Sequence, residues 1–542
     1  MQGLRAVRRA LSNSQVLAAE LGYAAFCVTM HGSWVAMLIY AFEQGGVGEA
    51  GIVGFAVLAP ASLLAPVASV AFSRLPPHRS LAAGFAAQTV GLALVGAAIG
   101  VGAPRFVVYP TMALLLIPQL VSRPTMLSVL PVVVDDPAEL AAANATAGLL
   151  ETIGAFLGPP LAGFAILAAA DPGAAFWTAS AVMAAGTVAA LRVPRVDRHP
   201  DDEPATQSPL AEAASTIRLL RREPDTRLLV IMMSLSLVIF GALNVALVAI
   251  AVDQLGRNEA TAGLLAGAVG IGGVVGASMS FLLVGRRRLT TPIAVGLLSV
   301  ALPIMALAAT DSTVLVVALL ALTGIGRPVL EVAGRTLLQG LSAEDTLARI
   351  FGVQEGLAMS ALAVGNLSFS VVAVATDLAT ALFVFGLILP AVLALQYSRL
   401  RRIDDARPGV DPQLLRLIRR IPIFAPLPAF TIEQLLVNLG YVEFAPHATI
   451  FDRGDHGDLL YVVADGSAVV ELADGEVETR AGGFFGEIAL LRDQPRMAGV
   501  RAGADGMLCY TVEREVFLTA ISGNGRSMAR TVREVERRLG ED

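Results

Sequence analysis

Lysine is absent from this 542-residue chain: all 39 basic residues are arginine, and cysteine occurs only twice. The lack of lysine excludes Schiff-base chemistry and a phosphate-binding loop that depends on a lysine. Cys27 and Cys509 match no metal or redox spacing, so we expect two buried thiols that do not pair. Arginine as the sole strong cation, with abundant alanine, glycine and proline, is typical of GC-rich bacterial coding.

Charge is also scarce. Charged residues make up 15% of the chain and hydrophobic residues 55%, and the mean hydropathy is +0.69. Such values indicate a multi-spanning membrane protein with a smaller soluble part. From Asp411 onward, 20 acidic and 14 basic residues give a net charge of −6, whereas the preceding part is neutral. An acidic tail argues against nucleic acid as its ligand.

Twelve apolar runs are long enough to cross a hydrocarbon core of ~30 Å. With the N-terminus inside, the outer loops hold only Arg105 and Arg257, and the other loop arginines lie inside. The positive-inside rule therefore places both termini in the cytoplasm of a bacterium, with the bundle in its cytoplasmic membrane. We interpret the first ten residues as a cytoplasmic lead-in and not as a removable signal. The runs cover residues 16–42, 47–72, 80–102, 106–134, 140–169, 173–191, 226–251, 260–284, 291–309, 312–339, 349–375 and 379–398.

The runs fall into two halves that resemble each other at an offset of 204 residues. Arg123-Pro124 recurs as Arg327-Pro328, and Glu151 recurs as Glu355. Parallel repeats of six spans are typical of two-lobed transporters. We therefore predict a multi-domain chain with an all-α polytopic bundle. Its parts are a six-helix half (1–192), a cytoplasmic linker (193–224) with an amphipathic helix near 210–222, a second half (225–400), a coupling linker and helix (401–420) and a soluble domain (421–542).

The soluble domain has a different pattern, in which short β-forming runs alternate with turn signals. The turns are predicted at Asp465-Gly466 and Asp474-Gly475. A β-roll capped by helices is the fold that this pattern predicts. The expected strands are 441–444, 449–451, 459–463, 468–472 and 507–512, and the expected helices are 412–420, 514–521 and 527–539.

The most informative motif of the chain lies in this domain, at residues 484–491. It reads Phe-Phe-Gly-Glu-Ile-Ala-Leu-Leu, and Pro495-Arg496 follow it. A glycine-led turn opens a short helix whose free backbone N–H groups can cradle an anion. Glu487 is suited to accept hydrogen bonds from sugar hydroxyls, and Arg496 is suited to hold a phosphate with two parallel hydrogen bonds.

Together with the glycine–aspartate turn at 452–458, this motif resembles the phosphate-binding cassette of cyclic nucleotide-binding domains, as in catabolite activator proteins and regulatory subunits of cAMP-dependent kinase. The resemblance implies that Glu487 binds the ribose 2′-hydroxyl and Arg496 the cyclic phosphate. Met497 departs from the Thr, Ser or Ala of ligand-binding members; its thioether cannot donate to guanine, which favours cAMP over cGMP. A degenerate domain kept for packing or dimerisation is the alternative. The implied ligand-binding residues are Gly486, Glu487, Ile488, Ala489, Arg496, Met497 and Ala498.

The part of the chain before the soluble domain resembles the major facilitator superfamily, because it combines twelve spans, two similar halves and a charged central loop. Gly-Ala-Phe-Leu-Gly-Pro-Pro at 154–160 is similar to the glycine–proline signature in span five of the family's antiporters. Small residues there would let helices approach closely. The loop at 73–79 lacks the aspartate of the family's acidic–basic loop motif. The resemblance implies a secondary transporter, and the span-five signature favours export of a small molecule by proton antiport.

Ionisable groups inside spans are functional candidates, because each is costly unless it is paired or hydrated. His31 is either a proton- or substrate-coupling group or a hydrogen-bonded structural histidine. We expect Glu151 and Glu355 to pair with arginines as gate or scaffold charges, whereas mid-span asparagines either line a cavity or join helices. The transport and gating candidates are Glu20, His31, Arg123, Glu151, Asn244, Arg327, Glu355 and Asn366.

Two hypotheses result. The first is a secondary transporter regulated by cytosolic cAMP, and the alternative is a transport-inactive, membrane-anchored cyclic nucleotide sensor. We expect no enzyme and no metal or redox cofactor, since the sequence shows no nucleophile–base pair, metal cluster or nucleotide-hydrolysing loop. The expected partners are the cyclic nucleotide, an unknown small-molecule substrate, protons and the lipid bilayer, and a homodimer is a further candidate.

Overall fold

The computed structural model divides the chain into two compact units. The first holds the helices α2 to α13, and the second holds the elements from α14 on. The structure describes residues 14–73, 76–133, 137–193, 218, 220–280, 283, 288–339, 341, 344–405, 412–427, 431–432, 435–436, 438–472, 475–492, 494–522, 527–528 and 530–533.

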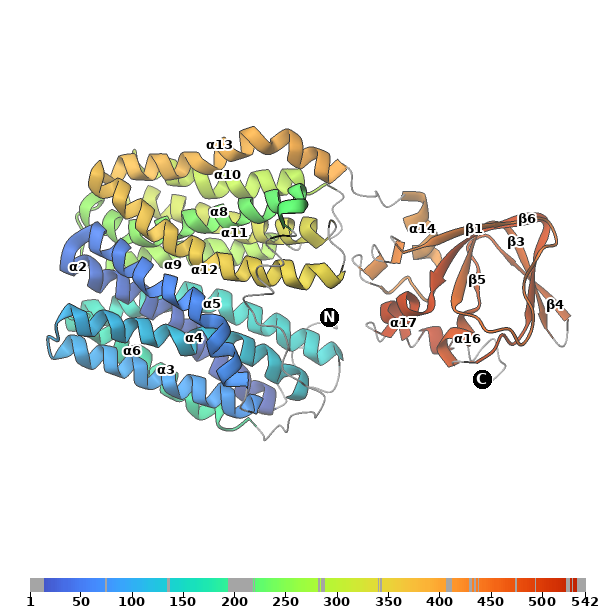
Figure 1. Cartoon of the computed structure of the whole chain (residues 1–542), viewed down its shortest axis with the longest axis horizontal. Coiled ribbons are helices and arrows are strands. Elements are labelled where there is room, and N and C mark those ends of the chain that lie inside the picture. Colours follow the sequence, from blue (N-terminus) through green and yellow to red (C-terminus); the bar gives the residue numbers. More distant parts are fainter. Residues whose placement is uncertain are drawn as a thin grey trace. The chain divides into compact units, whose positions relative to one another are not determined.

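The first unit is a bundle of long apolar helices (Figure 1). α2 (Ser14–Ser73) contains the first two predicted spans, joined across a kink at Gly45 and Gly46. Gly46 has a φ of 66°, in the left-handed region that favours glycine. The other elements of the bundle are α3 (Pro77–Gly100), α4 (Arg105–Val133), α5 (Pro137–Ala169), α6 (Gly173–Ala190), α8 (Pro224–Ala249), the π-helical η1 (Ile250–Gln254), α9 (Thr261–Ser280), α10 (Thr290–Leu307), α11 (Thr313–Gln339), α12 (Glu344–Ala375) and α13 (Leu378–Asp405).

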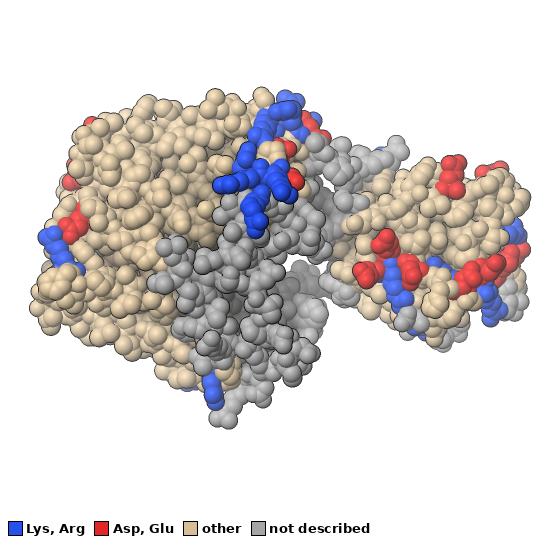
Figure 2. Space-filling view, in the orientation of Figure 1, with Lys and Arg blue, Asp and Glu red and all other residues tan. Residues whose placement is uncertain are grey.

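The helices agree with the predicted spans. Within the described ranges, ten are long and apolar enough to cross a membrane, with α2 counted once, and α4 contains a shorter apolar segment at Arg105–Leu120. On the face shown in Figure 2, the described part of the bundle is mostly uncharged, as a surface in contact with lipid requires. α13 continues to Asp405, beyond the predicted end of the second half at 400. Most of the amphipathic helix predicted near 210–222 and of the helix predicted at 527–539 lies outside the described residues.

Small residues hold the bundle together, as predicted for the glycine–proline stretch of α5. A Cβ added to Gly158 would overlap the backbone of Val28 and Gly32 in α2. On the other side of α5, a Cβ added to Gly263 of α9 would overlap the carbonyl oxygen of Pro159. α5 therefore packs backbone-to-backbone against two helices, because glycine removes the side chains that would separate them.

The second unit is an antiparallel sheet with short helices. The strand order is β1-β6-β3-β4, with β2 paired to β6 and β5 paired to β3. A cluster of buried apolar residues supports it, in which the rings of Phe424 and Phe517 meet edge to face at 6.2 Å. Its elements are α14 (Pro412–Arg420), β1 (Gly440–Phe444), β2 (Thr449–Phe451), β3 (Leu459–Leu472), β4 (Gly475–Arg480), β5 (Phe484–Phe485), α16 (Glu487–Arg492), β6 (Gly499–Glu513) and α17 (Arg514–Ser522).

The turn predicted at Asp465-Gly466 is wrong. These residues lie inside β3, which pairs with β6 on both sides of them, through Val463 with Cys509 and Ala468 with Ala502. The register shifts on both sides of them, and Gly466, with a φ of 76°, stays paired with Met507, so these residues form an irregular part of β3 and not a hairpin. At the second predicted turn, Leu472 pairs with Gly475, and Asp474 lies outside the described residues.

Candidate functional site

The cassette of the soluble unit begins where β5 ends. Phe484 and Phe485 are buried, and they pair with Val462 and Tyr461 of β3. Gly486 follows with a φ of 91°, a conformation that side chains rarely adopt. The chain turns there and Glu487 starts α16, so the predicted glycine-led turn is present.

Arg496 is buried directly behind this turn, with 4% of the residue exposed. Its Nη1 donates to the carbonyl oxygen of Gly486 at 2.9 Å, and its Nη2 donates to that of Leu459 at 2.8 Å. The Cζ atom lies 4.3 Å from the centre of the Phe451 ring, within cation–π range. Arg496 therefore ties the cassette to the start of β3.

The loop between β2 and β3 encloses the same side chain. The backbone N–H of Gly454 donates to the carbonyl of Arg496, and the N–H of Arg496 donates to the carbonyl of Asp455, both at 2.8 Å. A Cβ added to Gly457 would overlap the Arg496 guanidinium. Glycine is thus required at 457 by the space that the arginine occupies.

The electrostatics of the cassette centre on Arg496. Burial lowers the pKa of Arg496, and Tyr461, Asp458, Glu487 and Asp455 raise it in opposition. Arginine has so high an ordinary pKa that it stays charged at neutral pH. Its Nε is buried and has no hydrogen-bond partner within the described part of the chain. A buried cation with an unused donor is suited to bind one anionic group.

The other predicted cassette residues surround this centre. Glu487 is 1% exposed and lies close enough to raise the pKa of Arg496. Ala489 is buried, whereas Ile488 and Ala498 are half-buried. Met497 is 46% exposed, so its side chain is not buried together with Glu487 and Arg496.

Sequence reasoning missed three residues of this site: Gly457, Phe451 and Tyr461. The ring of Tyr461 stacks on that of Phe485 at 5.1 Å, and the Cζ of Arg496 lies 5.9 Å from its centre. The available signal was their position in or beside the glycine–aspartate turn. Tyr461 is placed beside Phe485 by the pairing of β3 with β5, whereas Phe451 and Gly457 reach Arg496 through β2 and the loop that follows it.

In the bundle, three predicted candidates are polar groups without hydrogen-bond partners among the described residues. Glu20 of α2 is 2% exposed, and both of its carboxylate oxygens lack a partner. The Nε2 of His31 lacks one as well. Asn366 of α12 is fully buried with neither amide atom partnered, and a Cβ added to Gly54 of α2 would meet it. α2 and α12, far apart in the sequence, lie side by side (Figure 1).

Of the remaining candidates, Arg327 lies close enough to His31 to interact with it electrostatically. Asn244 of α8 and Glu151 of α5 are half-buried. Arg327 of α11 is exposed, with its Cζ 5.1 Å from the centre of the Phe240 ring. The side chains of Arg123 and Glu355 lie outside the described part of the structure, so their pairing with Glu151 and Arg327 stays a prediction.

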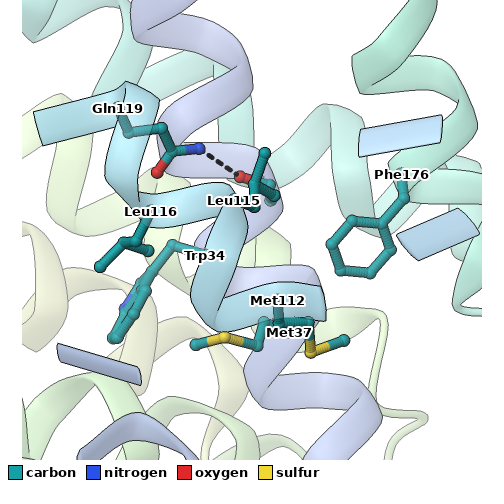
Figure 3. Close-up of a pocket in the computed structure, with 8 residues that line it drawn as sticks. Trp34, Met37, Met112, Leu115, Leu116, Gln119 and Phe176 are labelled. Atoms are coloured by element: carbon teal, nitrogen blue, oxygen red, sulfur yellow. Dashed lines mark hydrogen bonds between the residues drawn. The ribbon is translucent and has the colours of Figure 1, made fainter. Parts of the chain in front are cut away.

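A small cavity lies between α2, α4 and α6, and no predicted residue lines it (Figure 3). The Nε2 of Gln119 donates to the Oγ of Ser33 at 3.5 Å at one side of it. Its volume of about 10 Å³ holds about one water and no larger substrate. The lining residues are Ser33, Trp34, Met37, Met112, Leu115, Leu116, Gln119 and Phe176.

The fold and the cassette define a class of protein: an integral membrane bundle joined to a soluble domain with an anion-binding cassette. The chain belongs to the Major Facilitator Superfamily, whose family model matches residues 21–365. The model of the cyclic nucleotide-binding domain matches residues 441–524. A transporter bundle and a cyclic nucleotide-binding domain are thus combined in one chain.

Solved structures agree with the fold of the bundle. The nucleoside transporter NupG superposes with a TM-score of 0.60 at 12% identity, over 72% of this chain and 100% of that one. A POT family transporter superposes with a TM-score of 0.55 at 12% identity, over 72% of this chain and 96% of that one. At this identity the likeness shows the fold alone.

Relatives by sequence match the soluble domain. A cGMP-dependent protein kinase of Plasmodium berghei is 40% identical over 94 residues, which is 17% of this chain and 11% of the kinase. A cyclic nucleotide-gated potassium channel of Rhizobium etli is 30% identical over 148 residues, 27% of this chain and 39% of the channel. A cAMP-dependent protein kinase regulatory subunit of Colletotrichum orbiculare is 34% identical over 112 residues, 20% of this chain and 26% of the subunit. This chain therefore spans well under half the length of each of these relatives.

Proposed function

We propose that this protein is a secondary transporter of a small molecule, regulated by cAMP that binds its C-terminal domain. The observation that carries the proposal is the cassette: Glu487 and Arg496 are both buried beside the glycine turn that starts α16. Glu487 would accept hydrogen bonds from the ribose, and Arg496 would hold the cyclic phosphate through its unused Nε. Gly486, Ile488 and Ala489 would supply backbone contacts at the start of the helix.

We favour cAMP over cGMP because of the residue after the arginine. Met497 offers no hydrogen-bond donor to a guanine, and neither does Ala498. The relatives include proteins named for each of the two nucleotides. Binding of both nucleotides therefore has to be measured side by side.

Export by proton antiport is the mode of transport that the bundle supports best. The Glu20 carboxylate and the Nε2 of His31, both in α2, have no hydrogen-bond partner among the residues described. A buried carboxylate without a partner is costly while it is charged, so it is suited to take up a proton and release it when the bundle opens. The glycine–proline stretch of α5 packs against the same helix at Val28.

The proposed topology follows from the arginine distribution. Both termini and the C-terminal domain would lie in the cytoplasm, and the bundle would lie in the cytoplasmic membrane of a bacterium. The two halves at 1–192 and 225–400 would form the transport path, and residues 401–420 would pass the nucleotide signal to them. The signal requires that cAMP binds one transport state more tightly than the other.

Transport in reconstituted vesicles tests the proposal. The full-length protein is placed in vesicles that enclose a pH-sensitive dye, and a panel of small molecules is added with and without cAMP or cGMP. We expect a substrate-dependent proton flux that cAMP changes in the wild type and not in Arg496→Ala. A proton flux of the wild type that does not change when cAMP is added contradicts the proposed regulation by cAMP.

The alternative, a transport-inactive nucleotide sensor, is favoured by the loop at 73–79, which lacks the aspartate of the transporter motif. Calorimetry on the same full-length protein separates the two. cAMP binding without flux for any compound supports the sensor. No heat with either nucleotide overturns both functions.

A further inference from the structure

A second polar cavity lies at the ends of α8 and α13, and neither the cassette nor the transport candidates use it. Its volume is about 430 Å³, and Asp225, Arg399, Arg402 and Ile403 line it. α8 starts at Pro224 and α13 ends at Asp405, so the cavity lies where both helices leave their apolar segments.

The charges in this cavity are unequal. Arg399 is paired, because its Nε and Nη2 both donate to the Oδ1 of Asp225, at 3.0 and 2.8 Å. Arg402, one turn further along α13, lines the same cavity and is exposed. Arg402 has no ion-pair partner among the side chains that the structure describes. The cavity therefore carries one guanidinium in excess.

The charged side chains near the cavity do not neutralise this extra positive charge. Arg288 and Arg401 share one carboxylate, that of Asp405, each at 3.6 Å. Asp404 is buried, and its Oδ2 already accepts hydrogen bonds from the backbone N–H groups of Leu289 and Thr290 at 2.8 and 2.7 Å. Figure 2 shows basic side chains gathered with fewer acidic ones on this part of the bundle.

We propose that this cavity binds the phosphodiester of an anionic phospholipid. Arg402 is the principal donor, and Arg399 is oriented beside it by Asp225. The planar guanidinium matches the two oxygens of a phosphate, and basic groups at the ends of membrane-crossing helices attract anionic lipids. A free phosphate ion has the same chemistry, but the position at the ends of two apolar helices favours a lipid as the source.

The test uses the purified full-length protein in neutral detergent and short-chain phosphatidylglycerol, with phosphatidylcholine as the uncharged comparison. Bound lipid is counted by native mass spectrometry. Arg402→Gln is compared with Arg401→Gln, which removes the same charge from the neighbouring residue outside the cavity. We expect Arg402→Gln to weaken phosphatidylglycerol binding by about fivefold, the effect of one interfacial arginine. Arg401→Gln should stay within about twofold of the wild type, since its charge is shared with Asp405.

Three outcomes would overturn the proposal. Equal losses in the two variants would mean that only the general surface charge attracts lipid. Equal binding of phosphatidylglycerol and phosphatidylcholine would exclude recognition of an anion. Displacement of the lipid by millimolar inorganic phosphate in the wild type, and not in Arg402→Gln, would assign the cavity to a soluble ion. Unfolding temperatures without lipid confirm that both variants are folded, and Arg402→Lys, which keeps the charge without the planar fork, should retain part of the binding.

Discussion

Three buried polar side chains, one in the soluble unit and two in the bundle, differ in how many hydrogen-bond partners they have. In the soluble unit, Arg496 is buried but donates to two backbone carbonyls and lies on an aromatic ring. In the bundle, Glu20 and Asn366 are equally buried, and none of their side-chain polar atoms has a partner in the described structure. A domain that holds its cation with its own backbone has a preformed site. Unpartnered polar groups inside membrane spans are costly, so Glu20 and Asn366 stay candidates for a functional role.

Among the substitutions proposed here, we expect removal of Arg496 to cause the largest loss of free energy. Arg496→Ala leaves the carbonyls of Gly486 and Leu459 without their donors and removes the cation that would face the phosphate. We expect cAMP affinity to fall by about 2–5 kcal/mol, the range for loss of one partner of a buried charged pair. Calorimetry on the full-length protein measures it. Arg496→Lys keeps the charge without the planar guanidinium. Unchanged cAMP binding in both variants would show that Arg496 has only a structural role.

The next largest effect is expected on the stability of the bundle, when a close contact between two helices is disturbed. In Gly158→Ala, the new methyl group would overlap backbone atoms of α2, and we expect a loss of about 1–3 kcal/mol, as for overpacked cores. Thermal unfolding in detergent, followed by size-exclusion chromatography, measures the loss. Gly148→Ala on the same helix is the control, since a Cβ there meets no atom within 4 Å. Equal stability of the two variants would contradict backbone-to-backbone packing between α2 and α5.

Much of this architecture could be predicted from the sequence, because hydropathy and strand patterns are local. The spans follow from apolar runs, and β1 and β2 follow from short β-forming runs bounded by turns. The irregular strand at Gly466 could not be told from a hairpin, since a glycine after an aspartate fits both. Only the partner strand β6 decides between them.

The candidate site divides in the same way. Gly486, Glu487 and Arg496 belong to one short motif, so the sequence reveals them together. Phe451 and Gly457 enter the site only because β2 and its loop fold over Arg496. Asp404 is a still clearer case, since it accepts hydrogen bonds from residues 114 and 115 positions away. Contacts across such separations have no signal in a single sequence.

Asp404 is a buried acid of the bundle with several donors on one of its two oxygens, and its removal sharpens the contrast. Its Oδ2 accepts from the backbone N–H groups of Leu289 and Thr290 and from the Thr290 hydroxyl, at the start of α10. Asp404→Ala removes this cap, and we expect a loss of about 0.5–2 kcal/mol, as for other helix caps. The unfolding temperature in detergent reports it. Asp405→Ala, which removes an exposed acid from the same turn, should cost less, and the reverse order would refute the capping role.

The smallest effect on stability is expected from the thiol of Cys509. The fold of the soluble unit buries this thiol and keeps it neutral. Burial raises the pKa of the Cys509 thiol to about 11. Since only the thiolate is reactive, we expect almost no alkylation of the native protein at pH 8, and labelling that rises as the pH approaches 11. The raised pKa stabilises the fold below pH 9.0, and this contribution is lost as the pH rises through about 11. A Cys27→Ser background restricts the readout to Cys509, and urea-unfolded protein gives the full labelling. Rapid alkylation of native protein at pH 8 would mean that the β3–β6 ladder opens readily around a thiol that the structure buries completely.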